Sequence, residues 1–325
     1  MPTKASPETS AGWVSLNHEE NIQAVPAPLP LTPLPRWREG NRSLSSFSRD
    51  KGHRHYFLQL SIVCLLSFSP LLAAAANNLR PPSEVIPPGE TLVYEIRWDP
   101  PAWMFFLPTI SAGELTVQFK HQAVLDSKPV HQITARAISS GFFPKLTGVS
   151  VDDSFESFVD ADRFCSVRMT KKLREGKRLR DIVLTFNGER GTGRYLAYDA
   201  AKTPPAEVKN EEVKNLPRCV QDILSGIYVT RLQELRAGEK FPLVVSDDGT
   251  VKQVEVRVKE KETIEAVAGR FSAWKVETVS VFGGLFKGGG TFLVWFSDDA
   301  HRVPVKFEAK VKVGRVFGTV KQIKR

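Results

Sequence analysis

From about residue 85 to the C-terminus, apolar and polar residues alternate with a period of two. The clearest run spans residues 303–313, where Val, Phe and Ala occupy every second position and Lys or Glu fills most positions between them. Successive side chains of a β-strand point to opposite faces, so this run has one apolar face and one charged face. The pattern predicts a half-buried strand.

Further runs with the same period are separated by turn signals such as Asn187-Gly188 and Asp247-Asp248-Gly249. They span residues 92–98, 115–123, 130–138, 154–159, 165–173, 182–186, 194–198, 241–246, 251–258, 271–282, 291–296 and 316–323. Many strands at short spacing predict successive antiparallel hairpins. We therefore expect a mainly β protein built on one strongly curved antiparallel sheet, a half-barrel.

One segment, residues 220–235, instead has apolar residues at helical spacing, after Pro217 and before Gly238. It predicts a single long helix whose apolar stripe packs in the concavity of the sheet. The charged, Pro-containing residues 200–218 predict a linker before it. Linker and helix would divide a single domain, residues 77–325, into two meanders.

Residues 51–76 have the three parts of a secretory signal peptide: basic residues, an apolar run over 58–72, and four alanines ending at Ala76. The run is too short and too polar to be a good membrane span. We expect cleavage after Ala76 and export to the periplasm or cell envelope, with a retained anchor as the alternative.

Residues 1–50 contain a Pro-rich run and a Ser-rich continuation without helical or strand period, which predicts disorder. Two interpretations stay open. The segment is a proline-rich ligand for another protein, or translation starts near residues 44–57.

Cys165 and Cys219 remain after the expected cleavage, in a compartment where a disulfide could persist. Cys165 alternates with Val167 and Met169 on one strand face. This favours a buried free thiol over a disulfide.

Several short motifs occur together in a fixed order. They are residues 87–98 followed by Ala112-Gly113, Asp153 with Phe155-Glu156-Ser157, Gln221-Asp222 with Leu224-Ser225, Tyr228 and Arg231, Gly269 with residues 271–277, and residues 295–299 with Val303-Pro304-Val305. Over residues 85–325 the chain resembles the exported bacterial domain of unknown function 3108. The resemblance implies a periplasmic curved sheet with a helix in its concavity, related to lipoprotein-carrier half-barrels. It implies no activity and no catalytic residues.

Motifs that carry chemistry are absent from the sequence, including His-Glu-x-x-His, Gly-x-Ser-x-Gly, a phosphate-binding glycine loop and paired cysteines at metal spacing. We predict no catalytic residue, metal ligand or cofactor. Asp298, Asp299 and His301 could form a metal or proton-transfer site, but they lie between strands and favour a turn. Gln221, Asp222 and Arg231 could form a polar network facing the sheet. Helix capping and a buried ion pair are the plainer interpretation.

Three apolar loops carry the functional hint. The candidate ligand or membrane contacts in them are Trp103, Phe105, Phe106, Phe142, Phe143, Lys145, Phe286 and Lys287. Aromatic residues gathered at one rim would form a ligand mouth or a membrane-docking edge, with the two lysines available for anionic headgroups. In the competing interpretation these loops fold inward and plug the sheet.

The formal net charge of +9 is modest for 325 residues and suggests contact with anionic lipid or envelope polymers before nucleic acid. A soluble surface with no partner is the plainer interpretation of this charge. We expect a non-enzymatic envelope protein that binds a lipid or other amphiphile, or docks on a membrane surface. The alternatives are a cell-envelope hydrolase using Asp and His residues, and a structural or assembly partner. Convergence of His121, His131 or His301 with two carboxylates would favour the hydrolase, whereas a continuous apolar cavity would favour the binding protein.

Overall fold

The computed structural model describes residues 79–279, 291–311 and 313–325. The expected extension (1–50) and signal peptide (51–76), as well as Phe286 and Lys287, lie outside these residues. The described strands are β1 (Thr91–Asp99), β2 (Ile110–Leu125), β3 (Lys128–Ser139), β4 (Asp152–Asp160), β5 (Ser166–Glu175), β6 (Arg178–Asn187), β7 (Thr192–Asp199), β8 (Ala206–Lys214), β9 (Lys240–Ser246), β10 (Val251–Ala266), β11 (Gly269–Val279), β12 (Thr291–Ser297), β13 (Pro304–Lys310) and β14 (Arg315–Lys324). The described helices are α1 (Pro82–Val85), η1 (Ala102–Met104), α2 (Phe143–Thr147) and α3 (Ile223–Leu232).

These strands form one antiparallel sheet of 14 strands in the order β8-β7-β6-β5-β4-β3-β2-β1-β14-β13-β12-β11-β10-β9. Two meanders, β1–β8 and β9–β14, therefore meet where β1 pairs with β14, with Thr91 opposite Lys324 and Asp99 opposite Arg315. Among the described strands, β8 and β9 are the outer edges, so the sheet is not closed. The prediction of a mainly β antiparallel fold is confirmed.

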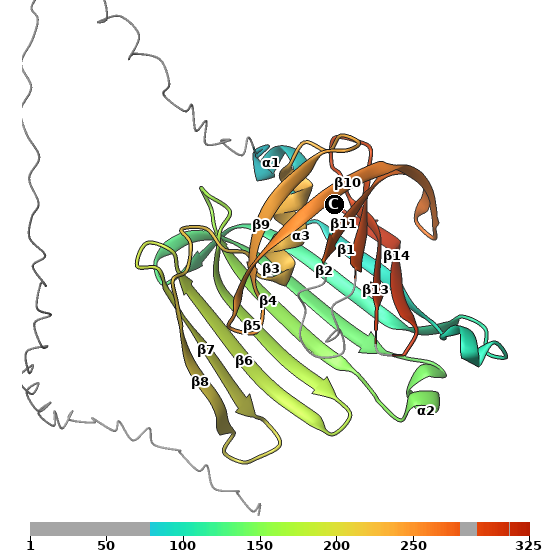
Figure 1. Cartoon of the computed structure of the whole chain (residues 1–325), viewed down its shortest axis with the longest axis horizontal. Coiled ribbons are helices and arrows are strands. Elements are labelled where there is room, and N and C mark those ends of the chain that lie inside the picture. Colours follow the sequence, from blue (N-terminus) through green and yellow to red (C-terminus); the bar gives the residue numbers. More distant parts are fainter. Residues whose placement is uncertain (1–78, 280–290, 312) are drawn as a thin grey trace, which may run out of the picture. The chain divides into compact units, whose positions relative to one another are not determined.

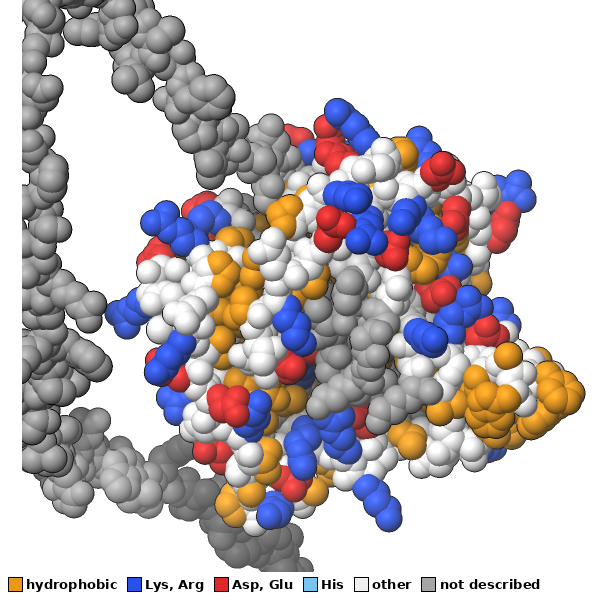
Figure 2. Space-filling model, viewed as in Figure 1, with side chains coloured by type: hydrophobic (Ala, Val, Ile, Leu, Met, Phe, Trp, Pro, Cys, Tyr) orange, Lys and Arg blue, Asp and Glu red, His pale blue; other side chains and the backbone are white. Residues whose placement is uncertain are grey.

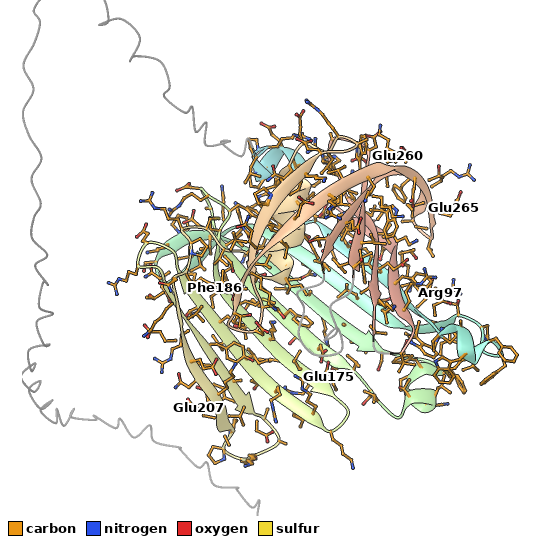
Figure 3. The ribbon with its side chains drawn as sticks, in the orientation of Figure 1. Arg97, Glu175, Phe186, Glu207, Glu260 and Glu265 are labelled. Atoms are coloured by element: carbon orange, nitrogen blue, oxygen red, sulfur yellow. A yellow bond between two sulfur atoms is a disulfide. The ribbon has the colours of Figure 1, made fainter. Side chains whose placement is uncertain are left out.

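The sheet curves around α3, which contacts β4 on one side and β9 on the other (Figure 1). The extended segment before the helix ties these regions together. Gln221 pairs in parallel with Val245 of β9, and the carbonyl oxygen of Val220 accepts a hydrogen bond from the amide of Ser166 in β5. The long strand β10 bends past a register shift after Val258, and Glu260 and Glu265 mark this curve in Figure 3.

The expectation of one long helix over residues 220–235 is wrong in length. The helix α3 has 10 residues, because Asp222 caps its start in extended conformation and Gln233 leaves the helix with ψ 156°. Leu224, Tyr228 and Leu232 of this short helix are buried.

The expected linker at residues 200–218 contains a strand, β8, which pairs with β7. Within β8 Val213 is the buried hydrophobic residue, and most of its other side chains are at least partly exposed. An edge strand that is largely exposed does not need apolar alternation, and charged residues protect it from pairing with other chains. The period of two is therefore missing from this part of the sequence.

The preference for a free Cys165 thiol is also wrong, since Cys165 and Cys219 form a disulfide with a Cα–Cα distance of 5.1 Å. Cys165 lies just before β5, after Phe164 with its positive φ of 56°. The alternation of the strand therefore does not extend to Cys165.

Lys171 of β5 is a buried basic residue. Its ammonium group is buried, donates a hydrogen bond to the carbonyl oxygen of Asp247 at 2.9 Å and pairs with the Asp247 carboxylate. The turn between β5 and β6 lies at Gly176, which has a positive φ.

Candidate functional site

An apolar cavity of about 290 Å³ lies inside the curved sheet. Strands β1–β4 and β12–β14 form its walls, and α3 contributes four residues. Its aliphatic and aromatic lining includes Leu92, Ile96, Leu115, Val117, Ala135, Ala137, Phe155, Ile223, Leu224, Ile227, Phe292, Val294, Phe307 and Val316. This volume is near the lower end of the range of about 300–1,000 Å³ that is usual for small-molecule sites.

Strand registers define two ends of this cavity. At one end, here called the helix end, Leu92 lies opposite Val117, and Leu224 and Tyr228 of α3 complete the wall. At the other, here called the rim end, Phe143 of α2 and Val316 of β14 line the cavity. The cavity therefore runs along the strands, from the helix to the loops that join β1 to β2 and β3 to β4.

Asp222 fixes the start of α3. Its Oδ1 accepts hydrogen bonds from the amides of Leu224 and Ser225, which caps the helix. Its Oδ2 accepts from the hydroxyls of Ser157 and Ser166, both at 2.5 Å, on β4 and β5. This carboxylate is fully buried and satisfied, and its role is to anchor the helix to the sheet.

Arg231, in the last turn of α3, forms a bidentate ion pair with Glu90. Its two terminal nitrogens donate to Glu90 Oε1 at 2.6 Å and Oε2 at 2.7 Å, and its Nε donates to the carbonyl oxygen of His301. Both side chains are 0% exposed. The pair lies beside Tyr228, with the guanidinium carbon 5.6 Å from the centre of the ring.

Tyr94 and Tyr228 both interact with this ion pair electrostatically, and both residues line the cavity. The hydroxyl of Tyr94 donates to the carbonyl oxygen of Pro304 at 2.7 Å. The hydroxyl of Tyr228 has no hydrogen-bond partner among the described residues, although the residue is only 2% exposed. Burial raises the pKa of Tyr228 above its ordinary value, so the hydroxyl stays protonated and able to donate.

Asp153 of β4 adds a carboxyl group to the cavity wall nearer the rim end, opposite Ala137. Burial raises its pKa from 3.8 to about 6, against the opposing effect of the hydrogen bond that it accepts from the amide of Arg174. Asp152, the preceding residue, is exposed and pairs with Arg136 on the other face of the sheet.

Exposed aromatic residues gather beside the rim end. The exposed fractions are 70% for Trp103, 89% for Phe105, 67% for Phe106 and 58% for Phe142. We call these four residues the aromatic rim. Figure 2 shows hydrophobic side chains concentrated at this projection, where η1 and α2 lie in Figure 1. Such groups of exposed aromatic residues are typical of contact surfaces.

The two described loops lie next to each other. Phe143 packs against Trp98 with ring centres 6.1 Å apart, and the amide of Ser140 donates to the carbonyl oxygen of Ala112. Phe143 is half-buried and lines the cavity, so it links cavity and aromatic rim. Lys145 is exposed on the same short helix.

The polar residues expected on the helix do not form one network. Asp222 caps the N-terminal end, while Arg231 pairs with Glu90 near the C-terminal end. Gln221 donates to the carbonyl oxygen of Phe164. Capping and a buried ion pair, the plainer interpretation, describe these residues better.

Asp299 forms a turn, because its Oδ1 accepts from the amides of His301 and Arg302. His121 and His131 lie close together, with ring centres 5.3 Å apart, while His301 contacts Val85. Within residues 79–279, 291–311 and 313–325, no group of three or more His, Cys, Asp or Glu residues could hold a metal ion.

A second, smaller cavity of about 50 Å³ shares Ile223 and Ile227 with the apolar cavity and extends to β9–β12. Ser246 lines it, is 1% exposed, and has a hydroxyl without a hydrogen-bond partner among the described residues. A space of this size suits a water molecule better than a ligand.

Glu90, Tyr228 and Asp153 are the site residues for which sequence reasoning assigned no role. Tyr228 and Asp153 were visible as parts of motifs, but their roles depend on which neighbours face them. Glu90 lies 141 residues from Arg231, and its charge in a Pro-Gly-Glu turn gave no sign of burial.

Comparisons with known proteins agree with the motifs. A family model described as a protein of unknown function, DUF3108, matches residues 93–321. No curated protein matches the sequence.

Three solved structures are similar to this chain. A β-barrel-like DUF1849 protein from Brucella abortus has a TM-score of 0.47 and 10% identity, covering 76% of this chain and 98% of that chain. A candidate exported protein with a YmcC-like fold from Bacteroides fragilis has a TM-score of 0.31 and 10% identity, covering 73% and 96%. A candidate lipoprotein from Parabacteroides distasonis has a TM-score of 0.30 and 12% identity, covering 73% and 95%.

Proposed function

The chain belongs to the DUF3108 family, and we propose that it is a non-enzymatic protein of the bacterial envelope that binds an apolar or amphiphilic molecule in its cavity. The observation that carries the proposal is the continuous apolar cavity of about 290 Å³ inside the sheet. Replacement of water by an apolar ligand lowers the free energy of a cavity lined by aliphatic and aromatic side chains.

Export is supported by chemistry as well as by the signal-like order of residues 51–76. The disulfide between Cys165 and Cys219 is typical of proteins from oxidising compartments such as the periplasm. None of the described helices is long and apolar enough to cross a membrane.

The aromatic rim gives the proposed protein a route to its ligand. Phe105 and Phe106 contact each other edge to face, with ring centres 5.9 Å apart, and remain largely exposed. Aromatic side chains insert well at the boundary between headgroups and acyl chains. Docking of the rim on a membrane would place the rim end of the cavity close to the lipid.

The direct test is native mass spectrometry of protein purified from the envelope, followed by extraction and identification of any bound lipid. The delipidated protein should then bind N-phenyl-1-naphthylamine, a dye whose fluorescence rises in apolar cavities. An absence of both extracted lipid and dye binding would contradict the proposal.

A matched pair of variants locates the binding. Ala137 lines the cavity between Leu115 and Asp153, so Ala137→Trp fills it with a large side chain. Thr134 lies on the same strand with Gln118 and Glu156 beside it on the polar face, so Thr134→Trp adds the same ring outside the cavity. We expect dye binding to be lost in Ala137→Trp and kept in Thr134→Trp.

A further inference from the structure

Four carboxyl groups are buried among the described residues. Three of them are held by an arginine, by a lysine, or by two serine hydroxyls and two amides, and these three are Glu90, Asp247 and Asp222. Asp153 is the fourth and differs from them. It is 6% exposed and accepts one hydrogen bond, at Oδ1, from the amide of Arg174 at 2.7 Å.

The second oxygen of Asp153, Oδ2, is open to the cavity. Asp153 lines the cavity, whereas Asp152 before it points to the other face of β4. Within the described part of the chain, Oδ2 has no hydrogen-bond partner, and unlike the Tyr228 hydroxyl it keeps accessible surface. A ligand in the cavity can therefore reach this oxygen.

The charged groups around Asp153 are occupied with each other. The pairs formed by residues of β3–β6 there are Arg136 with Asp152, Arg174 with Asp181, Arg178 with Glu175, which Figure 3 labels, and Lys171 with Asp247. On α2, Lys145 is exposed to solvent. None of the ion pairs between described residues includes Asp153, so burial raises the pKa of its carboxyl without a compensating ion pair.

Charge in the cavity wall has one sign. The charged residues among the described lining are both acidic, Asp153 and Glu114. Glu114 is exposed and pairs with Lys321, which leaves Asp153 to face a ligand. A buried carboxylate without a partner is costly, and a cation beside it removes that cost, whereas a second anion would raise it.

We propose that the cavity binds amphiphiles with a primary ammonium group, which donates a hydrogen bond to Oδ2 of Asp153 while the aliphatic chain lies along the cavity toward the helix end. This inference rests on the proposed function and names the class of its ligand. Asp153 lies nearer the rim end, and the lining toward the helix end is largely aliphatic and aromatic. The headgroup would therefore stay near the entrance and the chain would fill the interior.

The test measures displacement of N-phenyl-1-naphthylamine from the delipidated protein at pH 7.5 by decylamine, decanol and decanoate, each below its critical micelle concentration. Decylamine should bind about 10-fold more tightly than decanol, the lower end of the range for a hydrogen bond to a charged group. Decanoate should bind most weakly. The net charge of the chain is +9 and by itself favours decanoate, so the expected ranking cannot come from overall charge.

The pH dependence supplies a second measurement. Decylamine stays charged between pH 5 and 8, because alkylammonium groups lose their proton near the pKa of lysine, about 10.4. The Asp153 carboxyl, with a pKa of about 6, is mostly protonated at pH 5 and ionised at pH 8. Decylamine should therefore bind about 10-fold more weakly at pH 5 than at pH 8, while the affinity for decanol should not change.

Asp153→Asn removes the charge and keeps an oxygen that can accept from the Arg174 amide. It should abolish both the preference for decylamine and its pH dependence, and leave the affinity for decanol unchanged. Asp152→Asn, the matched control, makes the same substitution one residue away on the outer face and should keep both. Comparing two probes across these variants isolates the contact between ammonium and carboxylate, as a double-mutant cycle does.

The outcomes separate the two proposals. A parent protein that binds dye and decanol but does not prefer decylamine, or that prefers decanoate, overturns the inference and leaves the proposed function standing. A preference that persists in Asp153→Asn, or that is lost equally in Asp152→Asn, also overturns the inference alone. A parent that binds neither dye nor any probe overturns both. Should Asp153→Asn fail to fold, the pH dependence of decylamine binding to the parent still decides.

Discussion

The helix end and the rim end of the cavity differ in which kind of side chain is buried and which is exposed. At the helix end, charged groups are buried: Glu90 and Arg231 are both 0% exposed. At the rim end, apolar groups are exposed, with Phe105 at 89%. Each arrangement is costly in isolation, yet they occur at the two ends of one cavity.

The difference lies in whether partners are present. The buried charges at the helix end are hydrogen-bonded to each other and to the backbone, so that end is complete within the chain. The aromatic rim has little to contact beyond itself in the described structure. A region that satisfies its own groups stabilises the fold, whereas a region left with exposed apolar area indicates a contact with something else.

The largest expected effect comes from breaking the ion pair at the helix end. Glu90→Gln leaves the Arg231 guanidinium buried without a counter-charge and should lower the free energy of unfolding by about 3–5 kcal/mol. Urea denaturation of the variant and the parent protein measures this loss. Glu265→Gln, which breaks the exposed pair with Arg270, is the control and should change stability by less than about 1 kcal/mol. Equal effects in the two variants would mean that Arg231 is not truly desolvated.

Removal of the disulfide near the start of α3 should have the next largest effect on stability. Replacing Cys165 and Cys219 by Ala opens a loop of sequence separation 54 and should cost about 2–4 kcal/mol, mainly through the unfolded state. Thermal melting with and without reductant should give the same loss in the parent protein. If reductant leaves the melting temperature of the parent unchanged while the protein's thiols become titratable, the disulfide contributes no stability.

Asp153 provides a pH-dependent comparison near the rim end. Its pKa is about 6 in the folded protein against 3.8 ordinarily. As the pH rises, the unfolded chain therefore loses this proton at a lower pH than the folded protein does. The stabilisation by the protonated carboxyl is complete below about pH 4 and is lost as the pH rises through 6. Relative to Asp153→Asn, the parent should lose roughly 2 kcal/mol between pH 4 and 7. A pH-independent difference between the two proteins would contradict the assigned burial.

The smallest effect on stability belongs to the rim. Phe105→Ala should change the free energy of unfolding by less than about 0.5 kcal/mol, because the ring is exposed. It should nevertheless weaken binding to anionic phospholipid vesicles in a sedimentation assay. Phe119→Ala is the contrasting variant: the residue is 1% exposed and its truncation should cost about 3–5 kcal/mol. Strong destabilisation by Phe105→Ala would place the rim in the core.

Most of the fold was predictable because one face of most strands is buried. That burial enforces a period of two, and every run identified in the sequence corresponds to a described strand. The edge strand β8 was missed because Val213 is its one buried side chain and the others are partly or fully exposed. The helix was predicted too long at its start because Val220 and Gln221 fall in the run with helical apolar spacing but pair with neighbouring strands in extended form.

The site was less predictable because its chemistry depends on partners distant in sequence. Arg231 was recognised as a candidate, but its pairing with Glu90 follows from how α3 lies across the sheet. The aromatic residues of the rim could be identified from composition alone, since aromatic residues in turn-rich loops are unusual. Phe286 and Lys287 lie outside the described residues, so their place at the rim stays a prediction.

The pairing of β1 with β14 has a consequence for how the protein reaches its folded state. The ladder at the middle of the sheet pairs Thr91 with Lys324, so it cannot form until the last strand has been synthesised. Contacts between such distant residues slow folding. Until then, the first meander has an unpaired edge at β1, and a chaperone that covers this edge would protect the chain from aggregation.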